Sequence, residues 1–450
     1  MECALSAGFS RVNMNPTEPI PLGGYGNDDA RFHETIGQDI CVTAVALTDA
    51  RAQTVLLLSI DLVNADTPLC EGIRKRIYAD TGIGNIYICA VHSHAAPSVR
   101  RTDMACIRRY NALVCDRCSQ AVQEALKDRK SCSLYTGSIE ARDLNFVKHY
   151  KALDPKTGEI SVLGDLFGEP TGKVLLEHMS KADPTVHLVR FVRSGGKDIV
   201  LTNFRAHPHF DGGSKKYLLS SDYIGAFRVA LEALEGCHAV YFQGACGNIN
   251  ATSRMAGEQQ YHTAKSYGLA LAATVSEGLA RHMKPCPSGF IQTAQFTVMA
   301  QLQKSAPQLL AAAKQVQQLW KSTYDYKQCN DLGKAFGIRS PYHAGAIIAG
   351  KDRTPEDGRL ILNTVTVGSA LAFVTFPGEM FDTLSMRIED NSPFPTTLLL
   401  GYCNHNMSYL PSMQAYNYSC YETDITRFAP GTGEQVADTC IAHLKKAASL

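Results

Sequence analysis

Two pairs of histidines, each with one residue between its members, are the main chemical feature of this sequence. His92 and His94 follow the apolar run IYICAV, and His207 and His209 follow IVLTNFRA. In an extended backbone, residues two apart point to the same face, so one imidazole of a pair can bind a metal while its neighbour contacts a substrate. The spacing predicts a metal site, although ordinary loop and surface histidines among the 14 in the chain stay an equal alternative at this point.

Two further apolar runs end close to side chains that a metal could use. LAFVTF leads to Glu379, and TTLLLGY precedes Tyr409. Zinc accepts imidazole nitrogen and carboxylate oxygen at about 2.0–2.2 Å, so ligands from separate strand ends can share one ion. Without a metal, Glu379 would be a carboxylate at the start of a helix and Tyr409 a half-buried tyrosine.

The apolar runs must be strands of a sheet if their polar ends are to meet. Between residues 40 and 130, short β-branched runs alternate with stretches of helical periodicity, among them a long amphipathic helix expected over 108–128. This alternation is typical of an α/β fold in which helices cover the sheet. Ligands of such sheets gather at the carboxyl ends of the strands.

The chain reads as one domain over residues 1–450. It has no internal repeat, no low-complexity tract and no Pro/Ser linker. The stretch 306–337 has helical character, and the polar, Gly-rich stretch 338–360 predicts a loop or insertion. Loops such as 154–172 and 338–360 are expected to line the substrate pocket.

Composition limits the classes of partner. Apolar residues make up 45% of the 450 residues, enough for a sizeable core, and 44 Lys and Arg against 43 Asp and Glu leave a net charge of +1. Such a balance predicts neither a nucleic acid nor an anionic membrane as partner. No apolar run reaches the ~18–20 residues that cross a bilayer. A small-molecule substrate is expected, and the sequence leaves the oligomeric state open.

Cysteine usage predicts free thiols. Fifteen cysteines are too sparse in this length for a disulfide framework, and the first residues show no basic stretch followed by an apolar one. A cytoplasmic location is therefore expected. Cys115 and Cys118 have C-x-x-C spacing, but they lie in a helical pattern without a second pair, which favours two packed thiols over a redox or metal site.

A series of motifs runs in order from about residue 7 to residue 448: PLGGYGN, AVHSHAAPS, ARDLNF, NFRAHP with LLSSDYIG, QGACGNIN, FPGEMF, and NMSYLPS with YE. In this order they resemble the N-terminal catalytic domain of the neutral/alkaline (non-lysosomal) ceramidase family, as in a shortened bacterial-type member. Those enzymes are zinc amidases that cleave the amide bond of ceramide. The resemblance implies mixed β-sheets layered with helices, and an end at Leu450 implies that the family's C-terminal β-sandwich domain is missing.

The resemblance also implies a set of site residues. The positions that match the family's zinc ligands are His92, His207, Glu379 and Tyr409. Five other positions match residues that contact the substrate or steady the oxygen that gains charge. They are His94, Gly24, Arg142, Tyr421 and Glu422, which follows Tyr421 as in the family and is expected to bind the substrate.

One departure from the family changes the expected chemistry. The family's nucleophilic serine corresponds to Asn250, within the stretch GNINA, and an asparagine cannot form an acyl-enzyme. A zinc ion can instead activate water. The sequence therefore predicts a zinc-dependent hydrolase of an amide, ester or lactone bond in a small polar metabolite. His94 would transfer protons, Tyr421 and Arg142 would stabilise the charged oxygen, and Asn250 would hold the carbonyl or the water.

Alternatives remain for the function and for four residues. The same groups would suit a metal-dependent isomerase or lyase on a sugar-like carbonyl substrate, or a non-catalytic metal-dependent ligand-binding protein. Cys246 is either a substitute nucleophile or, as favoured here, a packed thiol. His209 is expected beside the ligands or at the surface. Asp61 and Asp222 either orient a zinc-bound imidazole or are turn carboxylates.

Overall fold

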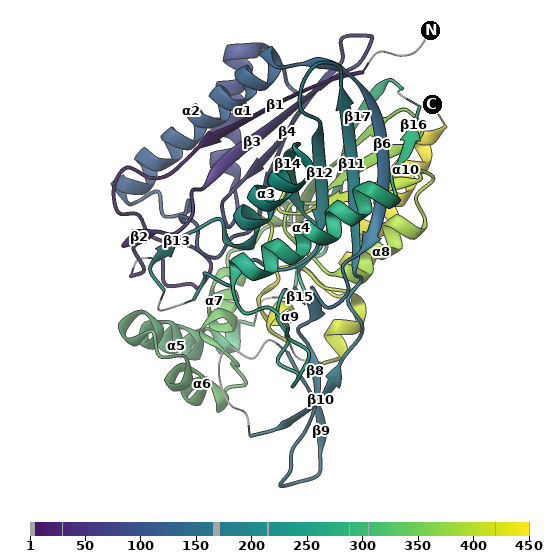
Figure 1. The fold of residues 1–450 in the computed structure, drawn as a ribbon. Coiled ribbons are helices and arrows are strands. Elements are labelled where there is room, and N and C mark those ends of the chain that lie inside the picture. The colour runs from purple at the N-terminus through teal and green to yellow at the C-terminus, as the bar shows by residue number, and fades with distance from the viewer. Residues whose placement is uncertain are drawn as a thin grey trace.

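Two β-sheets packed face to face form the centre of the molecule (Figure 1). The computed structural model describes residues 5–28, 30–164, 172–213, 216–287, 289–304, 306–418 and 420–449. The large sheet contains, in spatial order, β14 (His238–Gln243), β12 (Ile199–Phe204), β11 (Thr185–Arg193), β6 (Lys130–Glu140), β1 (Leu5–Asn13), β3 (Cys41–Thr48), β4 (Thr54–Ile60) and β5 (Ile86–Ala90), with β16 (Lys284–Cys286) paired to β6. The small sheet contains β17 (Ile291–Met299), β18 (Arg359–Val367), β19 (Leu371–Thr375) and β21 (Thr396–Leu400).

Helices cover the outer face of each sheet, which makes four layers. On the large sheet lie α1 (Thr67–Thr81), α2 (Ala105–Lys127), α3 (Asp222–Glu235) and α4 (Ala264–Arg281). On the small sheet lie α8 (Asp382–Asp390) and α10 (Thr432–Ala448). The α/β class predicted from the alternation of apolar runs is confirmed, and α2 begins at Ala105, three residues before the expected start.

The apolar character of the strands follows from burial on both faces. In β4, Leu56, Leu58 and Ile60 pack toward α1 and α2, whereas Val55 and Leu57 pack into the layer between the two sheets. Because successive side chains point to opposite faces, a strand covered on both sides must be apolar throughout. The same rule explains the run IYICA of β5, all of whose residues are buried.

Three helices form a small subdomain at the lower left of Figure 1: α5 (Leu310–Thr323), α6 (Tyr326–Lys334) and α7 (Pro341–Gly350). The helical prediction for 306–337 holds apart from a break at Tyr324, whose φ is 49°. Of the two alternatives predicted for 338–360, the loop is wrong, because this stretch contains α7 and the 3-10 helix η2 (Pro355–Gly358), and the insertion stays a prediction. Ser340 caps α7, and Ala344 packs against Trp320, so local capping and tertiary packing outweigh the glycines.

Short elements complete the described chain. They are β2 (Thr35–Ile36), β13 (Leu218–Leu219), β7 (Phe146–Val147), β15 (Ile249–Asn250), β8 (Tyr150–Leu153), β9 (Ile160–Leu163), β10 (Val174–His178), β20 (Glu379–Met380), β22 (Tyr409–Leu410), α9 (Tyr421–Ile425), and the 3-10 helices η1 (Pro307–Leu309) and η3 (Met413–Asn417). Within the expected loop 154–172, residues 160–163 form β9, and residues 165–171 lie outside the described residues.

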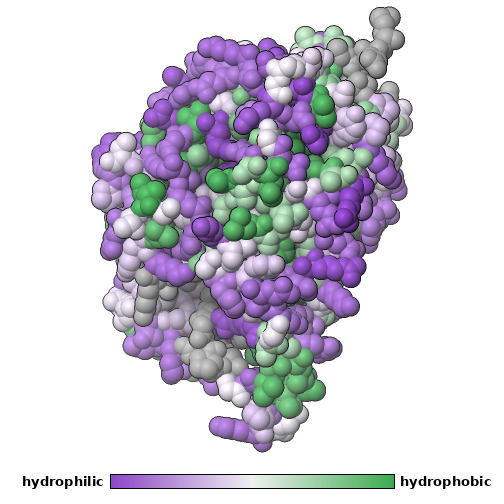
Figure 2. Space-filling model, in the orientation of Figure 1, coloured by the Kyte–Doolittle hydropathy of each residue, from purple (hydrophilic) through white to green (hydrophobic). Residues whose placement is uncertain are grey.

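The surface is mostly polar in the view of Figure 2, with a hydrophobic patch at the tip of the separate three-stranded sheet β10-β8-β9. Ile160, Val174 and Leu176 are exposed there. In the described part of the chain, no helix has both the length and the apolar character that crossing a membrane requires. The described cysteines are free thiols, and Cys118 is buried in α2 with Cys115 half-buried beside it, as expected for packed thiols.

Candidate active site

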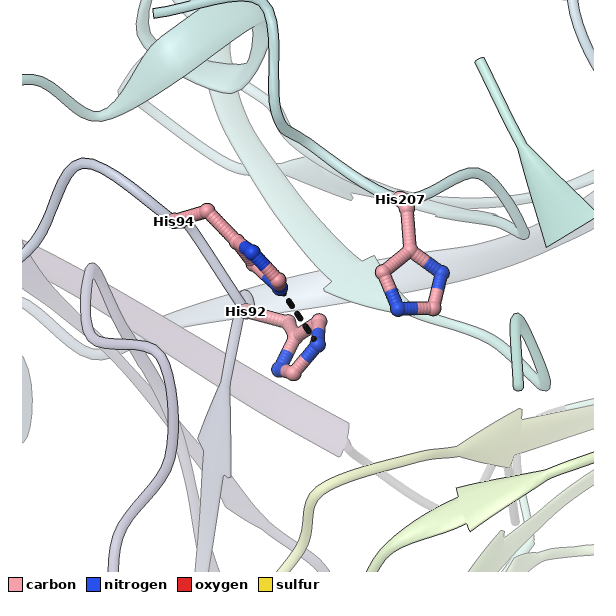
Figure 3. A group of neighbouring side chains, drawn as sticks. All are labelled: His92, His94 and His207. Atoms are coloured by element: carbon pink, nitrogen blue, oxygen red, sulfur yellow. Dashed lines mark hydrogen bonds between the residues drawn. The ribbon is translucent and has the colours of Figure 1, made fainter. Parts of the chain in front are cut away.

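Three imidazole rings from two loops meet at one point (Figure 3). His92 and His94 lie directly after β5, and His207 lies directly after β12. The Nε2 atoms of His92 and His94 are 3.1 Å apart, and one ring nitrogen from each of the three histidines lies within 4.8 Å of the others. The strands that the sequence predicted to end in histidine pairs therefore bring those histidines together, because β5 and β12 deliver them to the same place.

A carboxylate and a tyrosine complete this cluster from the small-sheet side. Glu379 Oε2 lies 3.3 Å from His207 Nε2 and 3.7 Å from His92 Nε2. Glu379 and Tyr409 are direct partners in the parallel pair β20–β22, and the Tyr409 hydroxyl is hydrogen-bonded to the Glu379 carboxylate. The four positions predicted as metal ligands thus lie around one point, although they come from distant parts of the chain.

The hydrogen bonds of two histidines direct their Nε2 lone pairs to the centre. His92 Nδ1–H donates to the Val63 carbonyl oxygen at 2.7 Å, and His207 Nδ1–H donates to the Ile249 carbonyl oxygen at 3.0 Å. A neutral imidazole that donates through Nδ1 has no proton on Nε2. Backbone acceptors of this kind commonly fix the tautomer of metal-binding histidines.

The donor set fits a divalent cation such as zinc. For a tetrahedral ion with ligands at about 2.0–2.1 Å, neighbouring ligand atoms lie roughly 3.3–3.4 Å apart. Within the predicted ligand set, Glu379 Oε2 lies 3.3 Å from His207 Nε2 and 3.7 Å from His92 Nε2, close to this value. Burial alone would neutralise Glu379, but His92 and His207 lower the pKa of its carboxyl to about 2, and burial lowers the pKa of His92 to about 3. Cys246 and Glu379 raise the pKa of His207 to about 10 despite burial, so a metal ion that binds here would displace a proton from this imidazole.

Backbone strain marks the same point. His92 has a φ of 69° and Ser408, next to Tyr409, has a φ of 82°, although neither is a glycine. Such conformations cost about 1–3 kcal/mol each and persist where the surroundings impose them. The His92 N–H donates to the Leu62 carbonyl oxygen at 2.9 Å, which holds this turn and aims the ring at the cluster.

Tyr402 is part of the cluster and was missed by the sequence analysis. Its ring stacks on His92 with centroids 4.0 Å apart, and its hydroxyl donates to Glu379 Oε2 at 3.3 Å. The same hydroxyl lies 3.1 Å from Cys246 Sγ. Cys246 is fully buried, also accepts from Gln243 Nε2 at 2.9 Å, and does not line the cavity described below, which agrees with a packed thiol rather than a nucleophile.

A cavity of about 1090 Å³ opens onto the cluster. Among the predicted residues, its walls include Gly24, His92, His94, His207, His209, Asn250, Glu379, Tyr409 and Tyr421. Gly24 has a φ of 104°, and a Cβ there would lie 2.9 Å from the His94 ring, so this position needs glycine. His209 lies at the wall with Nε2 3.3 Å from Thr252 Oγ1, beside the ligand positions as expected.

Arg142 does not lie in the site, which corrects its predicted role. Its side chain is 78% exposed and its Nε donates to Glu140 Oε2 at 2.6 Å. The neighbouring Asp143 has a φ of 63°, so the chain turns directly after β6 and leaves Arg142 on the outside. The motif ARDLNF contains the arginine, but the turn decides where its side chain goes.

Glu422, which was expected to bind the substrate, does not line the cavity. Its ion-pair partner Lys148 lines the cavity instead. Glu422 is fully buried, with Oε1 2.8 Å from Lys148 Nζ and Oε2 2.9 Å from His149 Nε2. These cations hold the pKa of the Glu422 carboxyl far below its usual range despite burial. Lys148 lines the cavity, and its Nζ lies 5.4 Å from the centre of the Tyr409 ring. A lysine within the run NFVKHY was the available sequence signal for this residue.

The two candidate orienting carboxylates have other partners. Asp61 accepts from both terminal nitrogens of Arg228, at 2.8 and 2.6 Å, and so ties the end of β4 to α3. Asp222 accepts from the backbone N–H of Asp211 at 2.7 Å at the start of α3. Neither contacts a histidine of the cluster among the hydrogen bonds of the described residues, so both are structural carboxylates.

Comparison with solved structures identifies the fold. The structure matches the crystal structure of neutral ceramidase from Pseudomonas aeruginosa with a TM-score of 0.72 and 14% sequence identity, over 99% of this chain and 75% of that chain. It matches a second structure, described as ceramidase complexed with C2, with a TM-score of 0.71 and 14% identity, over 98% of this chain and 74% of that chain. The sequence itself matches no protein-family model and no curated protein. The expected ceramidase-like fold is confirmed, since at this identity the likeness concerns the fold.

Proposed function

We propose that this protein is a zinc-dependent hydrolase that cleaves an amide, ester or lactone bond in a small polar metabolite. The observation that carries the proposal is the convergence of imidazole, carboxylate and phenol donors at one point of a large cavity. His92, His207, Glu379 and Tyr409 would hold the ion. The ceramidase-like fold supports a hydrolase. The resemblance matches Asn250 to the family's nucleophilic serine, and an asparagine there would form no acyl-enzyme, so the proposal uses metal-activated water.

When bound, zinc supplies a Lewis acid that polarises a carbonyl and lowers the pKa of water to about 7. His94 is the proton-transfer group. It lines the cavity, its Nδ1 is buried without a hydrogen-bond partner among the described residues, and burial beside two other imidazoles lowers its pKa well below the usual range. A neutral imidazole at this position can take a proton from the attacking water and pass it to the leaving group.

Charge on the substrate oxygen would be stabilised by Tyr421 and Lys148. The Tyr421 ring packs edge-on against the Tyr409 ring at 5.7 Å, and both Tyr421 and Lys148 line the cavity. Lys148 thereby takes the role first assigned to Arg142, because its buried ammonium lines the cavity 5.4 Å from the centre of the Tyr409 ring. Asn250, which lines the cavity beside His207, would orient the carbonyl through its amide.

Metal analysis tests the ligand assignment. The purified protein should contain about one equivalent of zinc, and His207→Ala and Glu379→Gln should lose most of it, while the exposed His282→Ala, a matched control, should retain it. The same samples are screened against amides, esters and lactones. Full metal content in His207→Ala would show that the ligand set is wrong.

A second candidate function is a metal-dependent isomerase or lyase on a sugar-like carbonyl substrate. The neutral His94 beside the proposed ion favours it, because the pair could equally remove a proton next to a polarised carbonyl. Turnover in ¹⁸O-labelled water separates the two, since only hydrolysis places the label in the product. A cytoplasmic location and the absence of nucleic acid and membrane partners stay predictions from the sequence.

A further inference from the structure

The wall of the cavity is strongly cationic, although the whole chain has a net charge of +1. Among the described residues, its basic side chains include Arg100, Arg353, Arg427, Lys148, Arg254 and Lys321. The acidic side chains of the described wall are Asp28, which accepts a hydrogen bond from Ser98, and Glu379 of the metal cluster. Basic side chains therefore outnumber acidic ones among the described residues of this wall, although the chain as a whole is nearly neutral.

Three of these arginines come together from separate segments. Arg100 follows the His92 loop, Arg353 follows α7, and Arg427 follows α9. Arg427 Nη1 lies 4.0 Å from Met407 Sδ, and the neighbouring Thr426 donates to the Tyr409 carbonyl oxygen at 2.7 Å. Arg427 thus lies on the Tyr409 side of the cavity, and Arg100 and Arg353 line the same cavity, which opens onto the metal cluster.

No carboxylate pairs with this group. Among the described residues, none of Arg100, Arg353 and Arg427 has a carboxylate within 4.0 Å, whereas the nearby Arg339 pairs with Asp424. Burial lowers the pKa of both Arg353 and Arg427. The charge of Arg427 lowers that of Arg353 further and Arg100 lowers that of Arg427, whereas the Asp357 carboxylate raises both without an ion pair within 4.0 Å among the described residues. Guanidinium groups held together without a counter-ion would be stabilised by an anion that bridges them.

We propose that the substrate of this site carries an anionic group, a carboxylate or a phosphate, which binds to Arg353 and Arg427 with Arg100 at the cavity mouth. The inference rests on the proposed function for the position of the reacting bond, which lies over the metal cluster. Aromatic side chains of the helical subdomain, including Trp320 and Tyr342, line the space between them and cover the body of the substrate. Arg353, which follows α7, joins this subdomain to the anion site.

Binding of simple probes to the metal-loaded protein tests the inference. Benzoate, phenyl phosphate and the neutral benzamide are titrated by calorimetry at low salt into wild type, the double variant Arg353→Gln/Arg427→Gln, and Arg281→Gln, an exposed control. Wild type and the control should bind at least one of the two anions at least about tenfold more tightly than benzamide, and NaCl should weaken this preference. The double variant should lose the preference for anions, and its affinity for benzamide should stay within about twofold of the wild-type value. The two anions distinguish a carboxylate from a phosphate site.

Each alternative outcome is decisive. Equal binding of both anions and benzamide by wild type would overturn the inference. So would an anion preference that survives in the double variant with unchanged metal content, because the anion would then bind to the ion or to Lys148. Metal content and thermal unfolding are measured on the same samples. A wild type without metal that still shows the arginine-dependent preference would refute the proposed function and leave this inference standing.

Discussion

Replacing Glu422 by glutamine tests whether a buried carboxylate holds Lys148 in the cavity wall. Glu422 is 0% exposed and contacts Lys148 at 2.8 Å and His149 at 2.9 Å, and the side chain of Lys148 is 3% exposed. The variant keeps the shape and removes the negative charge that faces the buried Lys148 ammonium. Breaking a buried pair in this way costs about 3–5 kcal/mol, so we expect the free energy of unfolding to fall by that amount.

Urea unfolding followed by the fluorescence of Trp320, the single tryptophan, measures the change. The matched control is Glu258→Gln, which removes a carboxylate 2.8 Å from His178 that is 40% exposed, and it should cost less than about 1 kcal/mol. Because the folded-state pKa of Glu422 is depressed, its stabilisation is present above the unfolded pKa near 4.5 and is lost on further acidification. The deficit of the variant should therefore shrink below pH 4.5. Equal, small losses for both variants at neutral pH would refute the reasoning.

Three further changes probe the site and its support. Gly24→Ala places a Cβ 2.9 Å from the His94 ring at a φ of 104°, so it should lower activity by more than tenfold. The control is Gly82→Ala, at a φ of 71° with no atom within 4 Å of the new Cβ, and it should lower only the free energy of unfolding, by about 1–3 kcal/mol. His94→Ala should keep its zinc and lose about 10²–10⁴-fold in turnover of the best screened substrate, and loss of zinc would make His94 a ligand instead. Burial raises the pKa of Asp222 to about 7, so the folded protein binds a proton that the unfolded chain releases near pH 3.8, and stability should fall as pH rises from about 4 to 7. Asp222→Asn should flatten this decline in urea titrations, and an unchanged slope would contradict the assignment.

The strand pattern and the positions of the clustered residues were predictable from sequence. Strands buried on both faces must be apolar throughout, so β4, β5 and β12 stand out as runs, and the polar residues that end them fall where ligands of α/β sheets gather. His92 and His207 could be found in this way without any structure. Glu379 and Tyr409 follow the same rule on the small sheet.

The errors arise because local sequence does not show where a side chain points or which tertiary contacts a segment makes. Arg142 stands in the expected motif, but a turn with a positive φ at Asp143 sends it to the surface. Glu422 stands beside Tyr421, yet it points into the core, and Lys148 reaches the cavity from a segment about 270 residues away in the sequence. The stretch 338–360 has loop-like composition and is largely helical because it packs against α5.

The sequence by itself determined which residue types could bind a metal and which strands carry them. Strands that are buried on both faces are continuous apolar runs, and such runs can be recognised in the sequence alone. Only the tertiary structure decided that these groups share one point, that Tyr402 and Lys148 join them, and that unpaired arginines from three segments face the same cavity. Metal sites and charged cavities depend on distances of a few ångströms between residues that are hundreds of positions apart. Such distances follow from the packing of two sheets and a helical subdomain, and no local pattern encodes them.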